Sequence, residues 1–311
     1  MKSTLPPGFG GRQISSASSI GALPAAPRGE NAPAEGARSE RFEARPARYS
    51  LDDVILSEEA LRRVRGMLAK VERHHVLYEE WGLKKLEPSS GRLAFNLYGP
   101  PGTGKTMLAE ALAARLDRPV IEVSYAEIES KYVGDTPKNI TAAFTAAREA
   151  NAALFFDEAD SILGRRMTSV TQASDHAVNV SRAVMLTQLD AFDGVVMFAT
   201  NLAKNFDEAF VRRILFHVEI PLPDEPARLR LWTTMLPLAI PGRAMLDLPR
   251  LAELSDGLAG GDIRNAILLS ATEAVQREGA RRVLTIVDLL DAIDVIRAAK
   301  RDVGAKLEPS R

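Results

Sequence analysis

Apolar residues recur with two different spacings along the chain, and the order of these patterns predicts an α/β fold. Short apolar runs are typical of strands buried in a parallel sheet, and they alternate with stretches of helical spacing up to Pro223. Strands that alternate with helices indicate a parallel sheet with helices on both faces. The five expected strands are residues 93–98, 118–125, 152–160, 194–201 and 216–220.

Helical spacing accounts for much of the remaining sequence. Ser57, followed by Glu58 and Glu59, is a start signal for a helix. The next segments are expected to be helical over residues 107–116, 140–151 and 177–192, to lead from a helix into a loop over 126–139, and to form a loop over 164–176. After Pro223 the pattern indicates helices alone, over residues 224–236, 248–256, 261–279 and 285–303.

Composition and pattern divide the chain into four regions. Residues 1–46 are rich in Gly, Pro, Ala and Ser and lack apolar periodicity, so we expect a disordered tail. The first 29 residues hold no acid, as in organellar transit peptides, but their Pro and Gly content argues against the amphipathic helix that such peptides need. We expect a large α/β domain over residues 47–223, a small all-helical lid domain over 224–303 and a flexible C-terminus over 304–311.

Charge and cysteine content exclude several kinds of chemistry. The formal net charge of -1 gives no electrostatic attraction for nucleic acid or an anionic membrane. The absence of cysteine excludes disulfides, thiolate catalysis and cysteine zinc sites, and it fits a reducing compartment. No apolar run approaches the roughly 20 residues of a transmembrane helix. We therefore expect a cytoplasmic protein that binds neither nucleic acid nor a membrane.

A glycine-rich segment between the first strand and the next helix carries the strongest chemical signal. Strand, glycine-rich loop and helix are the context of a phosphate-binding P-loop. Glycines let backbone N–H groups surround phosphate oxygens, Lys105 reaches the β- and γ-phosphates, and the Thr106 hydroxyl is placed to bind Mg²⁺. The alternative, a glycine turn before an ordinary helix, does not account for the Lys-Thr pair. The expected nucleotide-binding residues are Gly99, Pro100, Pro101, Gly102, Thr103, Gly104, Lys105, Thr106 and Met107.

Two carboxylates end the third expected strand. Asp157 and Glu158 follow an apolar run, as in a Walker B motif, and the carboxyl end of this strand is expected beside the P-loop. Asp157 would hold Mg²⁺, and Glu158 would orient or deprotonate an attacking water. These acids could instead cap the helix that follows and interact with its dipole. A P-loop about fifty residues upstream favours the first interpretation.

The two motifs together resemble those of AAA+ ATPases, and the resemblance runs from about residue 49 to about residue 303. It implies a P-loop NTPase fold with a helical lid, ATP and Mg²⁺ as cofactors, and assembly into a homo-hexamer. The segment around Val54 would lie near the nucleotide base. Gly260 and Gly261 resemble the lid residues that approach the base and ribose.

Three further features fit the same family, and each has a plainer alternative. Asn201, at the end of a strand, resembles sensor 1, although it could be a turn residue. Arg212 and Arg213 resemble the arginine-finger segment, although they could be surface cations. In many relatives a second finger arginine follows further along this segment, but here Ile214 follows Arg213 and that arginine is missing. The finger therefore stays unassigned between Arg212 and Arg213. No sensor 2 residue is assigned. The first pore loop of the ring, whose aromatic could instead be a core residue, is matched by Lys131, Tyr132, Val133 and Gly134.

The resemblance implies an ATP-hydrolysing remodeller that grips and unfolds a protein client through the pore of the hexamer. Residues 174–190 and the finger segment are similar to those of pachytene-checkpoint ATPases, which remodel HORMA-domain proteins and whose bacterial versions act in anti-phage signalling. An ATPase of a contractile injection system, or of another protein-disassembly process, is the alternative within the family. A nucleotide-dependent scaffold that does not hydrolyse ATP is the alternative outside this class.

Replacing Tyr132 separates a client-gripping residue from a core residue. If Tyr132 projects into a pore, Tyr132→Ala keeps folding, assembly and basal ATPase activity while client remodelling is lost. If Tyr132 lies in the core, the same change lowers the free energy of unfolding by roughly 3–5 kcal/mol. A thermal melt beside an ATPase assay distinguishes the two, and an unchanged melt with intact remodelling contradicts both.

Overall fold

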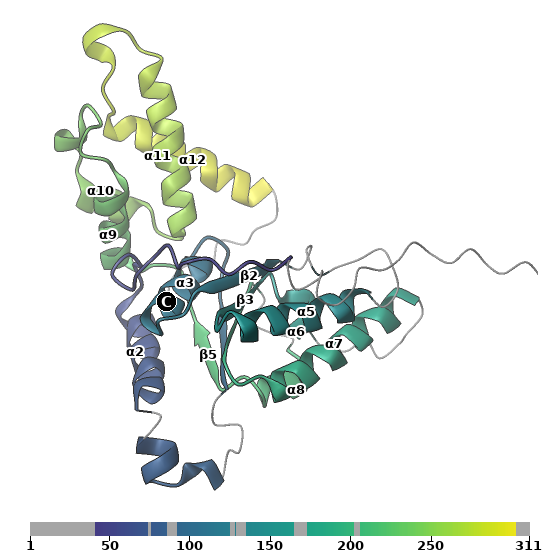
Figure 1. Cartoon of the computed structure of the whole chain (residues 1–311). Coiled ribbons are helices and arrows are strands. Elements are labelled where there is room, and N and C mark those ends of the chain that lie inside the picture. Colours follow the sequence, from purple (N-terminus) through teal and green to yellow (C-terminus); the bar gives the residue numbers. More distant parts are fainter. Residues whose placement is uncertain are drawn as a thin grey trace, which may run out of the picture. The chain divides into compact units, whose positions relative to one another are not determined.

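The sheet expected from the sequence is present, and the structure confirms the α/β fold class. The computed structural model describes residues 41–73, 76–85, 92–124, 128, 135–164, 173–201 and 206–302. Its strands are β1 (Leu93–Tyr98), β2 (Val120–Ser124), β3 (Ala153–Asp157), β4 (Val195–Thr200) and β5 (Phe216–Glu219). They form one five-stranded sheet in the order β2-β3-β4-β1-β5, and every neighbouring pair is parallel. Figure 1 labels β2, β3 and β5 of this sheet.

Helices flank the sheet and continue after it. Before and between the strands lie α2 (Glu58–Glu72), α3 (Lys105–Arg115), α5 (Asp135–Glu149), α6 (Asp160–Leu163), α7 (Ala173–Ala191) and α8 (Glu208–Val211). After the sheet come α9 (Glu225–Met235), α10 (Leu248–Leu254), α11 (Gly260–Val275) and α12 (Ile286–Asp302). A π-helical turn covers Val76–Glu80, and 3₁₀ turns cover Leu83–Lys85, Arg243–Met245 and Gly279–Arg281.

Three boundaries differ from the sequence expectation. The loop expected up to residue 139 is wrong, because α5 begins at Asp135. This helix holds Pro137 in its first turn. Backbone N–H groups in the first turn have no partner within the helix, so the N–H that proline lacks is not needed there. The loop expected over residues 164–176 is shorter, since α7 begins at Ala173. The strand expected to reach residue 160 ends at Asp157, because the next residue turns into a left-handed conformation.

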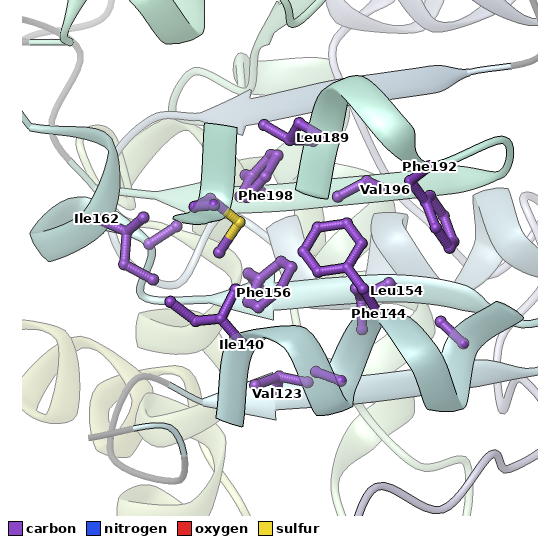
Figure 2. Close-up of a cluster of buried hydrophobic side chains, with 14 of the residues drawn as sticks. Val123, Ile140, Phe144, Leu154, Phe156, Ile162, Leu189, Phe192, Val196 and Phe198 are labelled. Atoms are coloured by element: carbon purple, nitrogen blue, oxygen red, sulfur yellow. The ribbon is translucent and has the colours of Figure 1, made fainter. Parts of the chain in front are cut away.

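Side chains of successive strand residues enter two buried clusters, one on each face of the sheet. Phe95 and Leu97 of β1 pack with residues of α2 and α3. Phe156 of β3 and Phe198 of β4 pack with Phe144 of α5, as Figure 2 shows. The rings of Phe156 and Phe198 stack with centroids 5.4 Å apart, and the ring of Phe144 lies 5.8 Å from that of Phe156. Because both faces are buried, the strand ends are held as a rigid edge.

At that edge of the sheet, the glycine-rich segment that follows β1 meets the end of β4. Tyr98 and Thr200, the last residues of β1 and β4, are register partners, and Gly99 N–H donates to the Thr200 carbonyl at 3.2 Å. After β1 the chain crosses to β2 at one edge of the sheet, and after β4 it crosses to β5 at the other edge. The connections that follow the neighbouring strands β1 and β4 therefore run in opposite directions. Open α/β sheets bind ligands at such a reversal.

The helices after β5 have their own buried cluster, which includes Trp232 and Leu251. Trp232 Nε1 donates to Ser255 Oγ at 3.0 Å, which joins α9 to the end of α10. Asp224 caps the start of α9 by accepting from Ala227 N at 3.0 Å. We propose, on this separate core, that the boundary between the α/β domain and the lid lies near Pro223. Among the described residues, no helix is long and apolar enough to cross a membrane.

The segment Phe42–Tyr49, which we call the strap, lies along the edge strand β2. Arg45 N donates to the Val120 carbonyl at 2.9 Å, and Val120 N donates to the Arg45 carbonyl at 2.7 Å. Phe42 is buried in the cluster that contains Phe144. The disordered tail expected over residues 1–46 therefore extends too far, because Arg45 pairs with β2 and Phe42 is buried. Residues 1–40 lie outside the described part of the chain.

The strap is fastened by a buried carboxylate on α3. Glu110, whose side chain is fully buried, accepts hydrogen bonds from Arg45 Nη1 at 3.0 Å and Arg45 Nη2 at 2.9 Å. It also accepts from the backbone N of Arg48 at 2.9 Å and from Arg48 Nε at 3.1 Å. Burial raises the pKa of the Glu110 carboxyl, but the bonds from the two arginines outweigh burial and lower the pKa to about 2.

The depressed pKa of Glu110 predicts a loss of stability in acid. Glutamate titrates near 4.5 when unperturbed, so the contribution of the ion pair is complete above that pH and is lost as pH falls toward the folded pKa of about 2. Between about pH 6 and about pH 3, the free energy of unfolding that Glu110 contributes should fall by on the order of 2 kcal/mol. Urea unfolding of the wild type and of Glu110→Gln measures this difference.

Glu72→Gln is the matched control, because Glu72 pairs with Arg115 of the same α3 at an exposed position. An exposed ion pair contributes little, so the free energy of unfolding of Glu72→Gln should stay within about 1 kcal/mol of the wild type. A difference between the wild type and Glu110→Gln that does not change with pH would contradict the assignment.

Candidate active site

The loop between β1 and α3 has a backbone that only glycine adopts readily. Gly99, Gly102 and Gly104 have φ values of 150°, 75° and 94°. A Cβ atom on Gly99 would lie 2.1 Å from the carbonyl oxygen of Ile220, which follows β5. The loop is therefore fixed against the end of the sheet. Its N–H groups lie at the start of α3, where a helix terminus favours anions.

Lys105, the first residue of α3, is directed back into this loop. The residue is 7% exposed, and Nζ donates to the carbonyls of Gly99 at 2.9 Å and Pro100 at 2.8 Å. Burial lowers the pKa of the Lys105 ammonium, while the carboxylates of Asp157 and Asp160 act in the opposite direction. A cation in this position can bind phosphate oxygens at the centre of the loop.

The two sequence motifs meet through one hydrogen bond. Thr106 Oγ1 donates to Asp157 Oδ2 at 2.9 Å, which joins the start of α3 to the end of β3. A hydroxyl beside a carboxylate fits Mg²⁺, which keeps several waters and takes one or two protein oxygens in addition to phosphate oxygens. In the described part of the chain no group of three His, Cys, Asp or Glu side chains could hold a metal, so a metal here would depend on phosphate as a further ligand.

Glu158 projects from a strained backbone. Its φ is 53°, a left-handed conformation that is uncommon for a residue with a side chain. Two bonds hold the turn: Glu158 N donates to Asp157 Oδ1 at 2.8 Å, and Ala159 N donates to the Ala199 carbonyl at 2.9 Å. The result is an exposed carboxylate at the mouth of the site. Asn201, also exposed, lies at the end of β4, and its N–H donates to Asp160 Oδ2 at 3.4 Å.

These side chains line one pocket of about 690 Å³. Most of the residues expected from the sequence share it: Val54, Pro101, Gly102, Thr103, Gly104, Lys105, Thr106, Met107, Asp157, Glu158, Asn201, Gly260 and Gly261. Gly99 and Pro100 contribute through their carbonyls, which bind Lys105. The pocket also has members that the motifs do not indicate: Arg48, Tyr49, Asp53, Ile55, Leu56, Ser57, Ala60, Pro221, Pro223, Leu231, Thr234, Met235 and Arg264.

The first turn of α11 closes one side of the pocket by backbone contact. Gly261 N donates to the Gly102 carbonyl at 3.0 Å, and a Cβ on Gly261 would lie 3.3 Å from Gly102 Cα. Asp262 accepts from Ala259 N at 2.7 Å, which caps this turn. The helical region thus contacts the phosphate loop through two glycines, so nucleotide in the loop can influence the position of α11.

The two candidate finger arginines lie outside this pocket and differ in their contacts. Arg213 Nε donates to both oxygens of Asp190, at 2.9 and 3.0 Å, and Nη1 donates to the Ala209 carbonyl at 3.0 Å. The Arg212 side chain is 81% exposed and lies 3.7 Å from Glu208. The candidate pore residues Lys131, Tyr132, Val133 and Gly134 lie outside the described residues.

The glycine loop, the buried lysine and the Thr106–Asp157 pair define a P-loop nucleotide-binding domain. Residues 95–222 match the family described as "ATPase family associated with various cellular activities (AAA)". The chain is 35% identical over 269 residues to the proteasome-activating nucleotidase of Methanopyrus kandleri, a match that covers 83% of this chain and 59% of that protein. It is 32% identical over 263 residues to the probable 26S proteasome regulatory subunit 10B of Caenorhabditis elegans, covering 82% and 62%. The match to the AAA family model is thus shown for residues 95–222, the part of the chain that carries the site.

The comparisons do not support the expected subfamily. These relatives carry the names of proteasomal ATPases, and this similarity gives no support to a HORMA-remodelling type. The chain spans about three fifths of the length of these relatives.

Replacing Glu158 and Lys105 should separate hydrolysis from binding. Glu158→Gln keeps the loop and the Thr106–Asp157 pair, so it should bind Mg·ATP while hydrolysis falls by on the order of 10²–10⁴-fold. Lys105→Ala removes the cation of the loop and should lose affinity for ATP. Calorimetry beside a phosphate-release assay checks both. Near-wild-type turnover by Glu158→Gln, or unchanged ATP affinity of Lys105→Ala, contradicts the respective role.

Proposed function

We propose that this protein binds Mg·ATP in the described pocket and hydrolyses it. The observation that carries the proposal is the convergence of Lys105, the Thr106–Asp157 pair and Glu158 at one edge of the sheet. The loop N–H groups and Lys105 hold the β- and γ-phosphates, and Mg²⁺, when bound, neutralises charge on their oxygens. Glu158 accepts a proton from the attacking water, and Asn201 helps to orient that water.

The second part of the proposal is that the chain acts as a homo-hexameric ring. Within the described residues, the cations that line the pocket are Arg48, Lys105 and Arg264, and Arg48 is held by Glu110. An arginine supplied by a neighbouring subunit stabilises the charge that develops on the transferred phosphoryl group. Arg212 fits this role better than Arg213, because Arg212 is exposed whereas Arg213 is fixed to Asp190 of its own chain. Arg213 then positions the segment that presents Arg212.

The third part is that hydrolysis drives the unfolding of a protein client. Relatives named for proteasome activation support a polypeptide substrate, and Tyr132 would contact it from a pore loop. No observation supports a HORMA-domain client, an anti-phage role or a contractile injection system over other clients, so the proposal stays at a protein client in general. A scaffold that does not hydrolyse ATP is disfavoured, because Lys105, Asp157 and Glu158 are all present in the pocket.

Mixing variants tests the ring and the finger together. Arg212→Ala keeps an intact pocket but lacks the finger, so it should bind ATP while its rate of hydrolysis falls, by roughly 10³–10⁵-fold if the finger acts as in other NTPases. Lys105→Ala keeps the finger but lacks a working pocket. Mixed rings should recover phosphate release, because Lys105→Ala subunits donate Arg212 to the pockets of their neighbours.

The control is a double variant, Lys105→Ala with Arg212→Ala, which should give no recovery when it replaces Lys105→Ala in the mixture. No recovery with the single variant, in mixtures shown to form rings, argues against a finger donated between subunits. Arg213→Ala is expected to be rescued as well, because Lys105→Ala subunits carry both arginines, so the two single variants are compared without mixing. Arg213→Ala should lose less hydrolysis than Arg212→Ala, since its Arg212 is still present; the reverse order would assign the finger to Arg213.

A further inference from the structure

The residues that line the nucleotide pocket are of two kinds. The phosphate loop, Asp157 and Glu158 supply polar groups, whereas Val54, Ile55 and Leu56 form a continuous apolar segment, which we call the wall. A nucleoside triphosphate is divided in the same way, with charged phosphates at one end and a flat base at the other. The base therefore belongs against the apolar wall.

This wall is the direct continuation of the strap. Arg48 and Tyr49, at the end of the strap, themselves line the pocket. A tight turn then leads into the wall: Ser50 donates from both N and Oγ to Asp53 Oδ2, each at 2.7 Å, and Val54 N donates to the Leu51 carbonyl at 3.4 Å. A shift of the strap would therefore be passed to the wall.

Glu110 holds the strap at this point. It accepts from the backbone N of Arg48 and, through both oxygens, from Arg48 Nε and Nη2. The Arg48 guanidinium also lies 5.6 Å from the centroid of the Tyr49 ring. Bonds between a guanidinium and a carboxylate that is closed off from water are among the stronger ones in proteins. They fix both the backbone and the side chain of Arg48.

Glu110 lies on the same helix as the phosphate-binding residues. The helix α3 begins at Lys105 and runs to Arg115, and its residues Leu108 and Leu112 are fully buried. A helix packed in this way moves as one body, so Glu110 keeps a constant distance to the phosphate loop. The carboxylate thus joins the helix that holds the phosphates to the segment that receives the base.

We propose that Glu110 is a positioning residue of the nucleotide site, which fixes the base-binding wall relative to the phosphate loop through Arg48. This inference rests on the proposed binding of Mg·ATP, and it goes beyond that binding by assigning the affinity for the nucleoside part to a residue that does not line the pocket. Loss of the hydrogen bonds between Glu110 and Arg48 weakens binding of the base and ribose and leaves the phosphate loop intact.

The test compares two probes, Mg·ATP and Mg·tripolyphosphate, in Glu110→Gln and in the wild type. Glu110→Gln should raise the Kd for ATP and the KM by about tenfold, the order of one charge-assisted hydrogen bond, with kcat within about twofold. Its affinity for tripolyphosphate, measured by competition, should be unchanged. All measurements are made well below the melting temperature of each variant.

Glu72→Gln removes the exposed partner of Arg115, which lies on α3 as Glu110 does. This variant should change neither the affinity for ATP nor that for tripolyphosphate. If Glu110→Gln does not fold, Arg45→Ala takes its place, because Arg45 binds Glu110 but does not line the pocket; it should weaken ATP binding alone, in the same direction. Equal affinities of variant and wild type for ATP, or equal weakening of both probes, would overturn the inference. Failure of the wild type to bind Mg·ATP would instead overturn the proposed function.

Discussion

The structure depends on how closely the phosphate loop is enclosed by backbone. At Gly99 a Cβ atom would lie 2.1 Å from the Ile220 carbonyl, and Gly102 meets Gly261 across a 3.0 Å hydrogen bond. No side chain fits at Gly99, so β1, β5 and the loop keep one arrangement. The same close approach brings the first turn of α11 to the loop. Nucleotide-dependent movement of the helical region would begin at this contact.

Charge within the site is arranged around that loop. A buried ammonium, Lys105, lies inside it, and the Thr106–Asp157 pair lies at its outer end. Glu158 is kept out of this cluster by its left-handed backbone, which separates the candidate base from the candidate metal ligand although the two residues are adjacent in sequence. Strain of this kind persists only where the surrounding bonds enforce it, and it is commonly found at functional sites.

Local sequence patterns predicted the parts of this site that depend on local structure. The glycines, Lys105 and Thr106 occur in a fixed spacing between a strand and a helix, and Asp157 ends an apolar run, so both motifs could be read without knowing the fold. The link between Arg48 and Glu110 joins residues 62 positions apart and has no local signal. The same holds for the finger: Arg212 and Arg213 are neighbours in sequence, and only Asp190, which binds Arg213, distinguishes them. The start of α5 was missed because Pro137 indicates a break equally well as a first turn.

Steady-state phosphate release by the purified chain shows most directly whether this pocket hydrolyses ATP with help from a neighbouring subunit. We expect turnover that requires Mg²⁺ and a specific activity that rises with chain concentration, because assembly brings each pocket its finger. Absence of turnover at every concentration, in protein that binds Mg·ATP and assembles, would contradict this expectation.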